Sequence, residues 1–172
     1  DIEAGRWLIY ASDPATSKED FSAYQKLYNK TFAQTDDPDL SGILFNYSIP
    51  AILRVSVPPS NPTSLVYGEA YPQNIILTPE QKTALITGFI DGDTVNNVQD
   101  GEDGIVWNIS GTPSTTGNII AGVHDVSYAR GLSTELGYQI VDNSANINEL
   151  NVTQKTITAT SFTASDKVYD GN

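Results

Sequence analysis

Two turn signals in the stretch from Leu65 to Thr94 constrain the fold of this chain more than any other feature. At Tyr67-Gly68, a glycine follows the end of an apolar run, and Pro72 fixes a second backbone angle shortly after it. Asp91-Gly92-Asp93-Thr94 follows the next apolar run, and an Asp-Gly pair in that position is typical of a tight turn. We therefore expect Gly88 and Gly92 in tight or left-handed backbone, beside a buried Phe89.

Short apolar or alternating segments recur along the chain, with glycine and proline between them. They predict strands at residues 5–10, 51–57, 105–109 and 156–163, and a further strand entered through residues 119–126. Trp7 in the first strand is expected in the core. The pattern predicts a mainly β fold, either a β-sandwich or a β-grasp-like sheet.

One or two short helices are expected within this β pattern. Phe21, Tyr24, Leu27 and Tyr28 recur at three- and four-residue spacing, which predicts a helix over residues 18–28 with Ser17 as its N-cap. Thr78-Pro79-Glu80-Gln81 forms a capping box with proline at the first helical position, so a short helix is expected up to about residue 84.

Composition narrows the functional classes. The chain has 172 residues, a net charge of −12 and a pI near 4.2, which argues against nucleic acid or anionic lipid as a partner. It contains neither cysteine nor methionine, so no disulfide can form, and we interpret it as a piece of a longer protein. A surface that is acidic and rich in Gly, Asn, Asp and Thr indicates a secreted protein. No apolar run is long enough for a membrane span.

The turn residues resemble a known module. Tyr67, Gly68 and Pro72, followed by Gly88-Phe89, Gly92-Asp93 and Thr94, resemble the MBG module of large Gram-negative surface proteins. This resemblance implies further strands at 137–141 and 150–152. It assigns residues 58–155 to one MBG-like β module, which begins after the stiff Pro58-Pro59 break.

Both ends of the sequence carry related resemblances. The phrase GRWLIYASDP at residues 5–14 is similar to the segment that follows the shaft of filamentous-haemagglutinin-like adhesins, which implies a strand at 42–50 and a shaft-end collar over 1–57. Lys167 with Tyr169-Asp170-Gly171 resembles the start of a YDG repeat, so residues 156–172 are expected to open another unit.

Together these resemblances imply a stalk or adhesion module of a two-partner-secreted adhesin on a Gram-negative cell surface. It would hold a binding region away from the cell. Its partners would be neighbouring repeats of the same parent chain, and the parent would use an outer-membrane transporter. The alternative is a module that binds a host glycan or host protein through exposed tyrosines, for which Tyr24, Tyr28, Tyr47 and Tyr71 are the candidates.

Candidates for catalysis or metal binding are few. The acidic residues Asp91, Asp93, Asp100, Glu102 and Asp103 could attract Ca²⁺, but their spacing lacks the ligand ladder of an EF-hand loop, and we expect no metal and no cofactor. Asp93-Thr94 is expected to cap local backbone groups instead. His124 is the sole histidine, and we expect it to be structural in a protein that is not an enzyme. Glycosylation sequons at Asn29, Asn46, Asn108 and Asn151 are left open.

Overall fold

The computed structural model describes residues 7–14, 16, 25–31, 42–90, 92–145, 148–161 and 163. Within them the fold is mainly β, as the sequence predicted, with one short α-helix and one 3-10 turn. The strands are β1 (Trp7–Ala11), β2 (Gln25–Leu27), β3 (Ile43–Tyr47), β4 (Ile52–Val55), β5 (Ser64–Val66), β6 (Ile86–Thr87), β7 (Gln99–Asp100), β8 (Val106–Ile109), β9 (Gly122–Arg130), β10 (Leu132–Ser133), β11 (Gln139–Asp142) and β12 (Asn148–Thr153). The helices are α1 (Pro79–Leu85) and η2 (Val95–Asn97).

The largest sheet has four strands in the order β5-β12-β9-β8. β12 is parallel to β5 and antiparallel to β9, which in turn is antiparallel to β8. Side chains alternate along β9: His124, Val126 and Tyr128 are buried, whereas their neighbours point away from the core. One face of this sheet therefore packs on the core and the other faces solvent.

A separate sheet at the other end of the body is entirely parallel, in the order β1-β3-β2. Its central strand β3 is almost wholly buried, with Phe45 and Tyr47 on the face that joins the main core. β1 is an edge strand, so Trp7 is 68% exposed. The expectation that Trp7 lies in the core is therefore wrong, because the side chains of an edge strand have neighbouring residues on fewer sides.

A third sheet, in the order β11-β4-β6, links these two regions, and β10 pairs with β7 beside it. β4 lies before the expected boundary at residue 57, yet it pairs with β11 and β6 from beyond that boundary. One hydrophobic core runs without interruption from Tyr28 and Tyr47 through Leu53 to Leu150. The described part of residues 1–57 thus packs onto the rest of the chain, as we expected.

Several local predictions are confirmed. Thr78 caps α1 through the predicted box: its side chain accepts from the Gln81 backbone, and the Gln81 side chain accepts from the Thr78 backbone. Gly68, Gly88 and Gly92 all have positive φ, and the Asp93 amide donates to the carbonyl of Ile90 to close the predicted turn. Phe89 is only half-buried, so the expectation of a fully buried ring is corrected.

Two predicted elements are wrong. Residues 25–27 form β2 and not the end of a helix, because their backbone pairs with β3; the earlier part of the predicted helix lies outside the described residues. Residues 156–161, the described start of the strand expected at 156–163, have no strand partner, and Ile157 is 91% exposed. An alternating sequence forms a strand only where a neighbouring strand satisfies its backbone.

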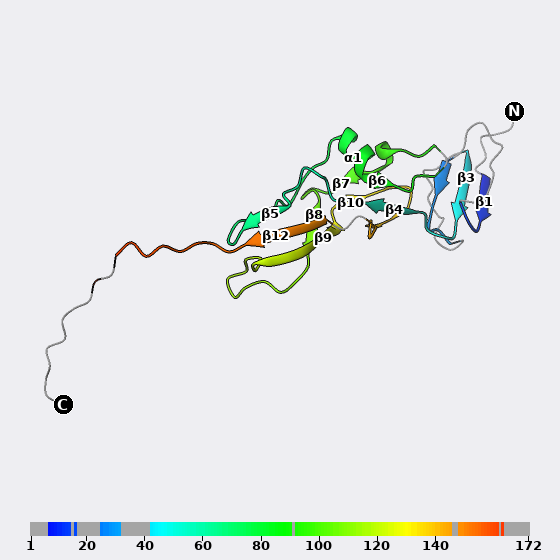
Figure 1. Ribbon diagram of the computed structural model, residues 1–172. Coiled ribbons are helices and arrows are strands. Elements are labelled where there is room, and N and C mark those ends of the chain that lie inside the picture. Colours follow the sequence, from blue (N-terminus) through cyan, green and yellow to red (C-terminus); the bar gives the residue numbers. More distant parts are fainter. Residues whose placement is uncertain are drawn as a thin grey trace, which may run out of the picture.

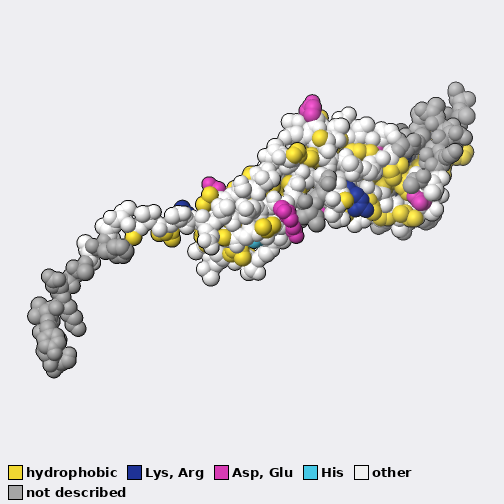
Figure 2. Space-filling model, viewed as in Figure 1, with side chains coloured by type: hydrophobic (Ala, Val, Ile, Leu, Met, Phe, Trp, Pro, Cys, Tyr) yellow, Lys and Arg dark blue, Asp and Glu magenta, His cyan; other side chains and the backbone are white. Residues whose placement is uncertain are grey.

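The body is elongated (Figure 1). The parallel β1-β3-β2 sheet lies at one end and the C-terminal end of β12 lies toward the other, where the chain leaves the body as an extended segment (Figure 1). The space-filling view shows charged side chains scattered singly over this face without a large patch of either sign (Figure 2). The chain therefore enters and leaves the folded body from opposite ends.

Candidate functional site

The most organised polar cluster in the described chain lies where β2 meets the turn after β6. We name it the Asp93 junction, and it consists of Lys26, Tyr28, Asp93 and Tyr138. The Asp93 carboxylate oxygen Oδ2 accepts hydrogen bonds from the hydroxyls of Tyr28 at 2.7 Å and Tyr138 at 2.6 Å. Its second oxygen, Oδ1, lies 3.2 Å from Nζ of Lys26. Three side chains from two other parts of the chain thus converge on the carboxylate of Asp93.

The backbone completes the Asp93 junction. The amide of Ile90 donates to the Tyr138 hydroxyl at 3.1 Å, and Lys26 Nζ approaches the Ile90 carbonyl at 3.5 Å. The rings of Tyr28 and Tyr138 meet edge to face with centroids 4.5 Å apart. The turn signalled by Asp-Gly therefore does more than reverse the chain, since it carries Asp93 to the two tyrosines.

Burial fixes the protonation of both phenols. Burial is the main cause that raises the pKa of Tyr28 above its ordinary value, and its hydrogen bonds with Tyr138 and Asp93 raise it further. Burial, followed by the hydrogen bond to Asp93, raises the pKa of Tyr138 to about 12. Both hydroxyls are therefore protonated at neutral pH and serve as donors, which is the state that the carboxylate requires.

The tyrosines proposed as a ligand platform are in the core. Tyr28, Tyr47 and Tyr71 are 0%, 1% and 5% exposed, and the rings of Tyr28 and Tyr47 stack on each other with centroids 5.5 Å apart. Tyr24 lies outside the described residues. These three buried rings offer no face on which a sugar could stack.

The acidic residues considered for Ca²⁺ are placed apart. Asp93 belongs to the junction, and Asp100 pairs with Nζ of Lys82 at 2.7 Å. Glu102 and Asp103 are exposed in the next turn, and Asp91 lies outside the described residues. Within the part of the chain that the structure describes, no three His, Cys, Asp or Glu side chains form a group that could hold a metal ion.

The Lys82–Asp100 ion pair is a second polar contact between distant segments. Lys82 is buried on α1 and also donates to the carbonyl of Val98 at 3.1 Å. The pair joins α1 to the segment formed by η2 and β7. Thr94 caps η2, as the sequence predicted: its side chain accepts from the Asn96 amide. Asp93 does not share this local role, which corrects the expectation for the Asp93-Thr94 pair.

His124 fastens the loop between β8 and β9. Its Nδ1 lies 2.7 Å from the carbonyl oxygen of Ser110, and its Nε2 lies 2.8 Å from that of Ile120. The Ser110 hydroxyl is occupied as well, because it accepts from the amide of Asp125 at 2.7 Å. The imidazole thus contacts backbone at both ring nitrogens and holds the two ends of this loop to β9.

The remaining motif residues are at the far end of the four-stranded sheet. Tyr67 follows β5, and hydrogen bonds with Ser114, then Thr116 and Asn118, lower the pKa of Tyr67. Pro72 is exposed and directly follows the buried Tyr71. Tyr169, Asp170 and Gly171 lie outside the described residues. The MBG-type residues that the structure describes therefore shape turns or the Asp93 junction.

The four sequons differ in accessibility. Asn29, Asn108 and Asn151 are exposed, whereas Asn46 is fully buried in β3. Asn46 is therefore closed to any modifying enzyme in the folded chain.

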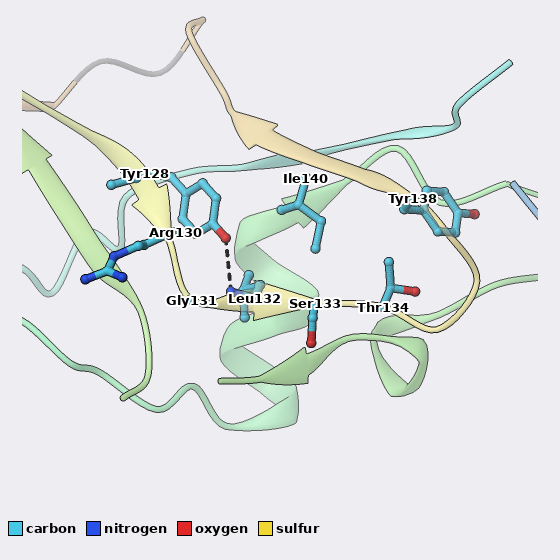
Figure 3. Close-up of a pocket in the computed structure, with 9 residues that line it drawn as sticks. Tyr128, Arg130, Gly131, Leu132, Ser133, Thr134, Tyr138 and Ile140 are labelled. Atoms are coloured by element: carbon cyan, nitrogen blue, oxygen red, sulfur yellow. Dashed lines mark hydrogen bonds between the residues drawn. The ribbon is translucent and has the colours of Figure 1, made fainter. Parts of the chain in front are cut away.

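A surface hollow of about 380 Å³ lies between β10 and the start of β11 (Figure 3). Its lining includes Leu132, Ser133, Thr134 and Ile140, with Tyr128 and Tyr138 at either end (Figure 3). The Tyr128 hydroxyl accepts from the Leu132 amide at 3.0 Å, so it is already occupied. Arg130 also lines the hollow, and the Thr134 hydroxyl accepts from the Leu136 amide at 3.2 Å.

Comparison with known proteins identifies no relative of this chain. The chain matches no family model, no curated protein sequence and no solved structure. Among the described residues, neither helix approaches the length and apolar character that a membrane-crossing helix needs.

Sequence reasoning identified Asp93 but missed its partners. Lys26 and Tyr138 were not singled out, because 64 and 45 residues, respectively, separate them from the contacts they make at Ile90 and Asp93. The available signal was the tyrosine that follows Gly137 at the start of a predicted strand. No spacing rule connects that tyrosine to a distant turn.

Proposed function

We propose that this chain is a stalk and adhesion module of a large bacterial surface adhesin, in which it holds a binding region away from the cell. The observation that carries the proposal is the placement of β1 and the end of β12 at opposite ends of an elongated body (Figure 1). Such a unit lengthens a chain when it is joined to further units. The resemblance to MBG, YDG and filamentous-haemagglutinin-like motifs is the reason for proposing an adhesin as the longer parent protein.

A spacer must keep its two ends in a fixed arrangement, and the Asp93 junction supports this role. It ties β2, from the region at one end, to the turn after β6 and to the start of β11. The same region shares the continuous hydrophobic core with the four-stranded sheet. Two independent kinds of contact, polar and apolar, therefore oppose bending between the ends.

The edges of the four-stranded sheet favour end-to-end growth over lateral pairing. At the β8 edge, the side-chain amide of Gln73 both donates to and accepts from the backbone of Trp107, at 3.2 and 2.8 Å. At the β5 edge, the Glu69 carboxylate accepts from the Val66 amide at 2.8 Å. Side chains thus occupy backbone groups that would otherwise be templates for another strand.

The rival function is a module that binds a host glycan or host protein through tyrosines. Tyr28, Tyr47 and Tyr71 are buried, so their rings are not accessible to a glycan or protein ligand. Tyr10, 39% exposed on the edge strand β1, is the tyrosine that we would test for such a role.

The proposal places the parent on a Gram-negative cell surface after two-partner secretion through an outer-membrane transporter. Neighbouring repeats of the same chain are the expected contacts, and the module itself is proposed to have no catalytic role and no cofactor. Its acidic charge suits a protein that does not bind nucleic acid.

A binding screen tests this function. The chain alone, and the chain joined to its neighbouring modules, are presented to glycan arrays and to extracellular host proteins. We expect no saturable binding to the chain alone, with any binding confined to the longer protein. Saturable binding to the chain alone that Tyr10→Ala abolishes, while the surface control Ile76→Ala leaves it intact, would replace the spacer with the rival function.

A further inference from the structure

The feature that carries a further inference is the position of β12. It is an interior strand of the four-stranded sheet, flanked by β5 on one side and β9 on the other. Asn151 to Thr153 are in register with Ser64 to Val66 on the parallel side. Asn148 to Val152 are in register with residues 126 to 122 on the antiparallel side. The last strand before the chain leaves the body is therefore paired on both sides.

Side chains hold the same strand in place. Leu150 and Val152 are 0% and 3% exposed in the main core. The Asn148 side-chain amide donates to the Val57 carbonyl at 3.1 Å, and the Thr153 hydroxyl donates to the Leu65 carbonyl at 3.2 Å. Sliding β12 along its axis would disturb backbone pairs, buried side chains and both of these hydrogen bonds.

The direction in which the chain leaves decides how a pull acts on these bonds. In Figure 1 the segment after β12 continues away from the body in roughly the line of the strand. Inter-strand hydrogen bonds run across a strand or at a slant to it, so a pull along β12 loads its pairs together. A pull across the strand would instead separate the pairs one after another.

We propose that β12 is a mechanical clamp, defined here as the strand that resists extension when the parent chain is pulled from the residues after Thr153. The inference deepens the proposed spacer function and rests on it, since tension matters only to a module placed between a cell and a bound surface. β5 is the parallel partner of β12 in this clamp. The Asn151 amide donates to the Thr63 carbonyl, and the Tyr67 amide donates to the Thr153 carbonyl, each at 2.8 Å.

Single-molecule pulling between paired cysteines tests the clamp, and the absence of native cysteine makes each attachment unique. The variant Ser60→Cys with Gln154→Cys pulls β5 and β12 from opposite ends, which shears them. The variant Ala70→Cys with Gln154→Cys pulls them from the same end, which peels them apart. Residues 60, 70 and 154 are all exposed, so the two variants form a matched pair.

We expect a several-fold higher unfolding force for the shearing pair than for the peeling pair. Val152→Ala should lower the shearing force, whereas Val123→Ala, a 64% exposed position on the adjacent β9, should leave it unchanged. Equal forces from the two attachment pairs would overturn the clamp. That result would not decide the spacer function, which depends on the binding screen. If Val152→Ala fails to fold, the comparison of the two pairs remains decisive.

Discussion

The Tyr28 hydroxyl donates a 2.7 Å hydrogen bond to the Asp93 carboxylate across 65 residues of sequence. Tyr28 follows β2 at one end of the elongated body, whereas Asp93 follows β6 in its middle. This single contact therefore connects two regions that the sequence assigned to a collar and to a module.

Removing the Asp93 carboxylate should lower the unfolding free energy. Asp93→Ala leaves two buried phenols without their acceptor and Lys26 without its ion pair, so we expect a loss of about 3–5 kcal/mol in unfolding free energy. Denaturant unfolding measures it. Asp103→Asn, in an exposed turn, is the control and should change stability by less than ~0.5 kcal/mol. Equal stability of Asp93→Ala and the parent chain would show that the junction holds nothing together.

Stability should fall in alkaline solution. Folding raises the pKa of Tyr138 to about 12 from its ordinary 10.0, and it raises the pKa of Tyr28 as well. The unfolded chain therefore releases these protons first as the pH rises. The contribution of both phenols is complete below pH 10 and is lost progressively as the pH rises toward 12. The unfolding free energy, measured across this range, should decline less steeply in Tyr138→Phe. An identical slope in the two proteins would be the contrary result.

Two glycines with similar backbone should respond differently to alanine. Gly88 and Gly92 have φ of +101° and +80°, but a Cβ on Gly88 would overlap the carbonyl oxygen of Ile52, whereas a Cβ on Gly92 meets open space. Gly92→Ala should therefore cost only the backbone strain of about 1–2 kcal/mol. Gly88→Ala should cost clearly more, because β6 must move away from β4. Equal melting temperatures for the two variants would contradict this packing.

The segment after β12 should be the first site of proteolysis. Lys155 is exposed in the extended segment, whereas Arg54 and Arg130, which are also exposed, lie in the paired strands β4 and β9. Brief trypsin treatment should cut after Lys155 and leave β1 to β12 intact, as mass spectrometry can show. Early loss of β1 to β3 would refute the packing of that region on the body.

Much of the fold was predictable because its signals are local. The capping box at Thr78, the glycine turns and most strands depend on residues within a few positions of each other. The failures involve distant partners. Residues 25–27 carry a helix-like spacing but pair with β3, and the alternating segment from Thr156 finds no strand to pair with. Pairing across a sheet overrides local pattern.

The site was less predictable for the same reason. The sequence correctly identified Asp93 as part of a turn motif, whereas its expected role as a cap for local backbone groups is wrong. Its actual contacts, with Tyr28, Tyr138 and Lys26, exist only once β2, β6 and β11 are assembled. Tyr28, Tyr47 and Tyr71, three of the four tyrosines considered as a binding platform, are core residues instead, because large aromatic rings stabilise a core most when they are fully buried.

The distance between the two ends of the body shows whether the module is a rigid spacer. Spin labels on Ser48→Cys, just after β3, and Gln154→Cys, just after β12, report it by double electron–electron resonance. A rigid spacer predicts one narrow distance distribution for the parent chain, and a broader one once Asp93→Ala removes the junction. A broad or divided distribution in the parent chain itself would contradict the account.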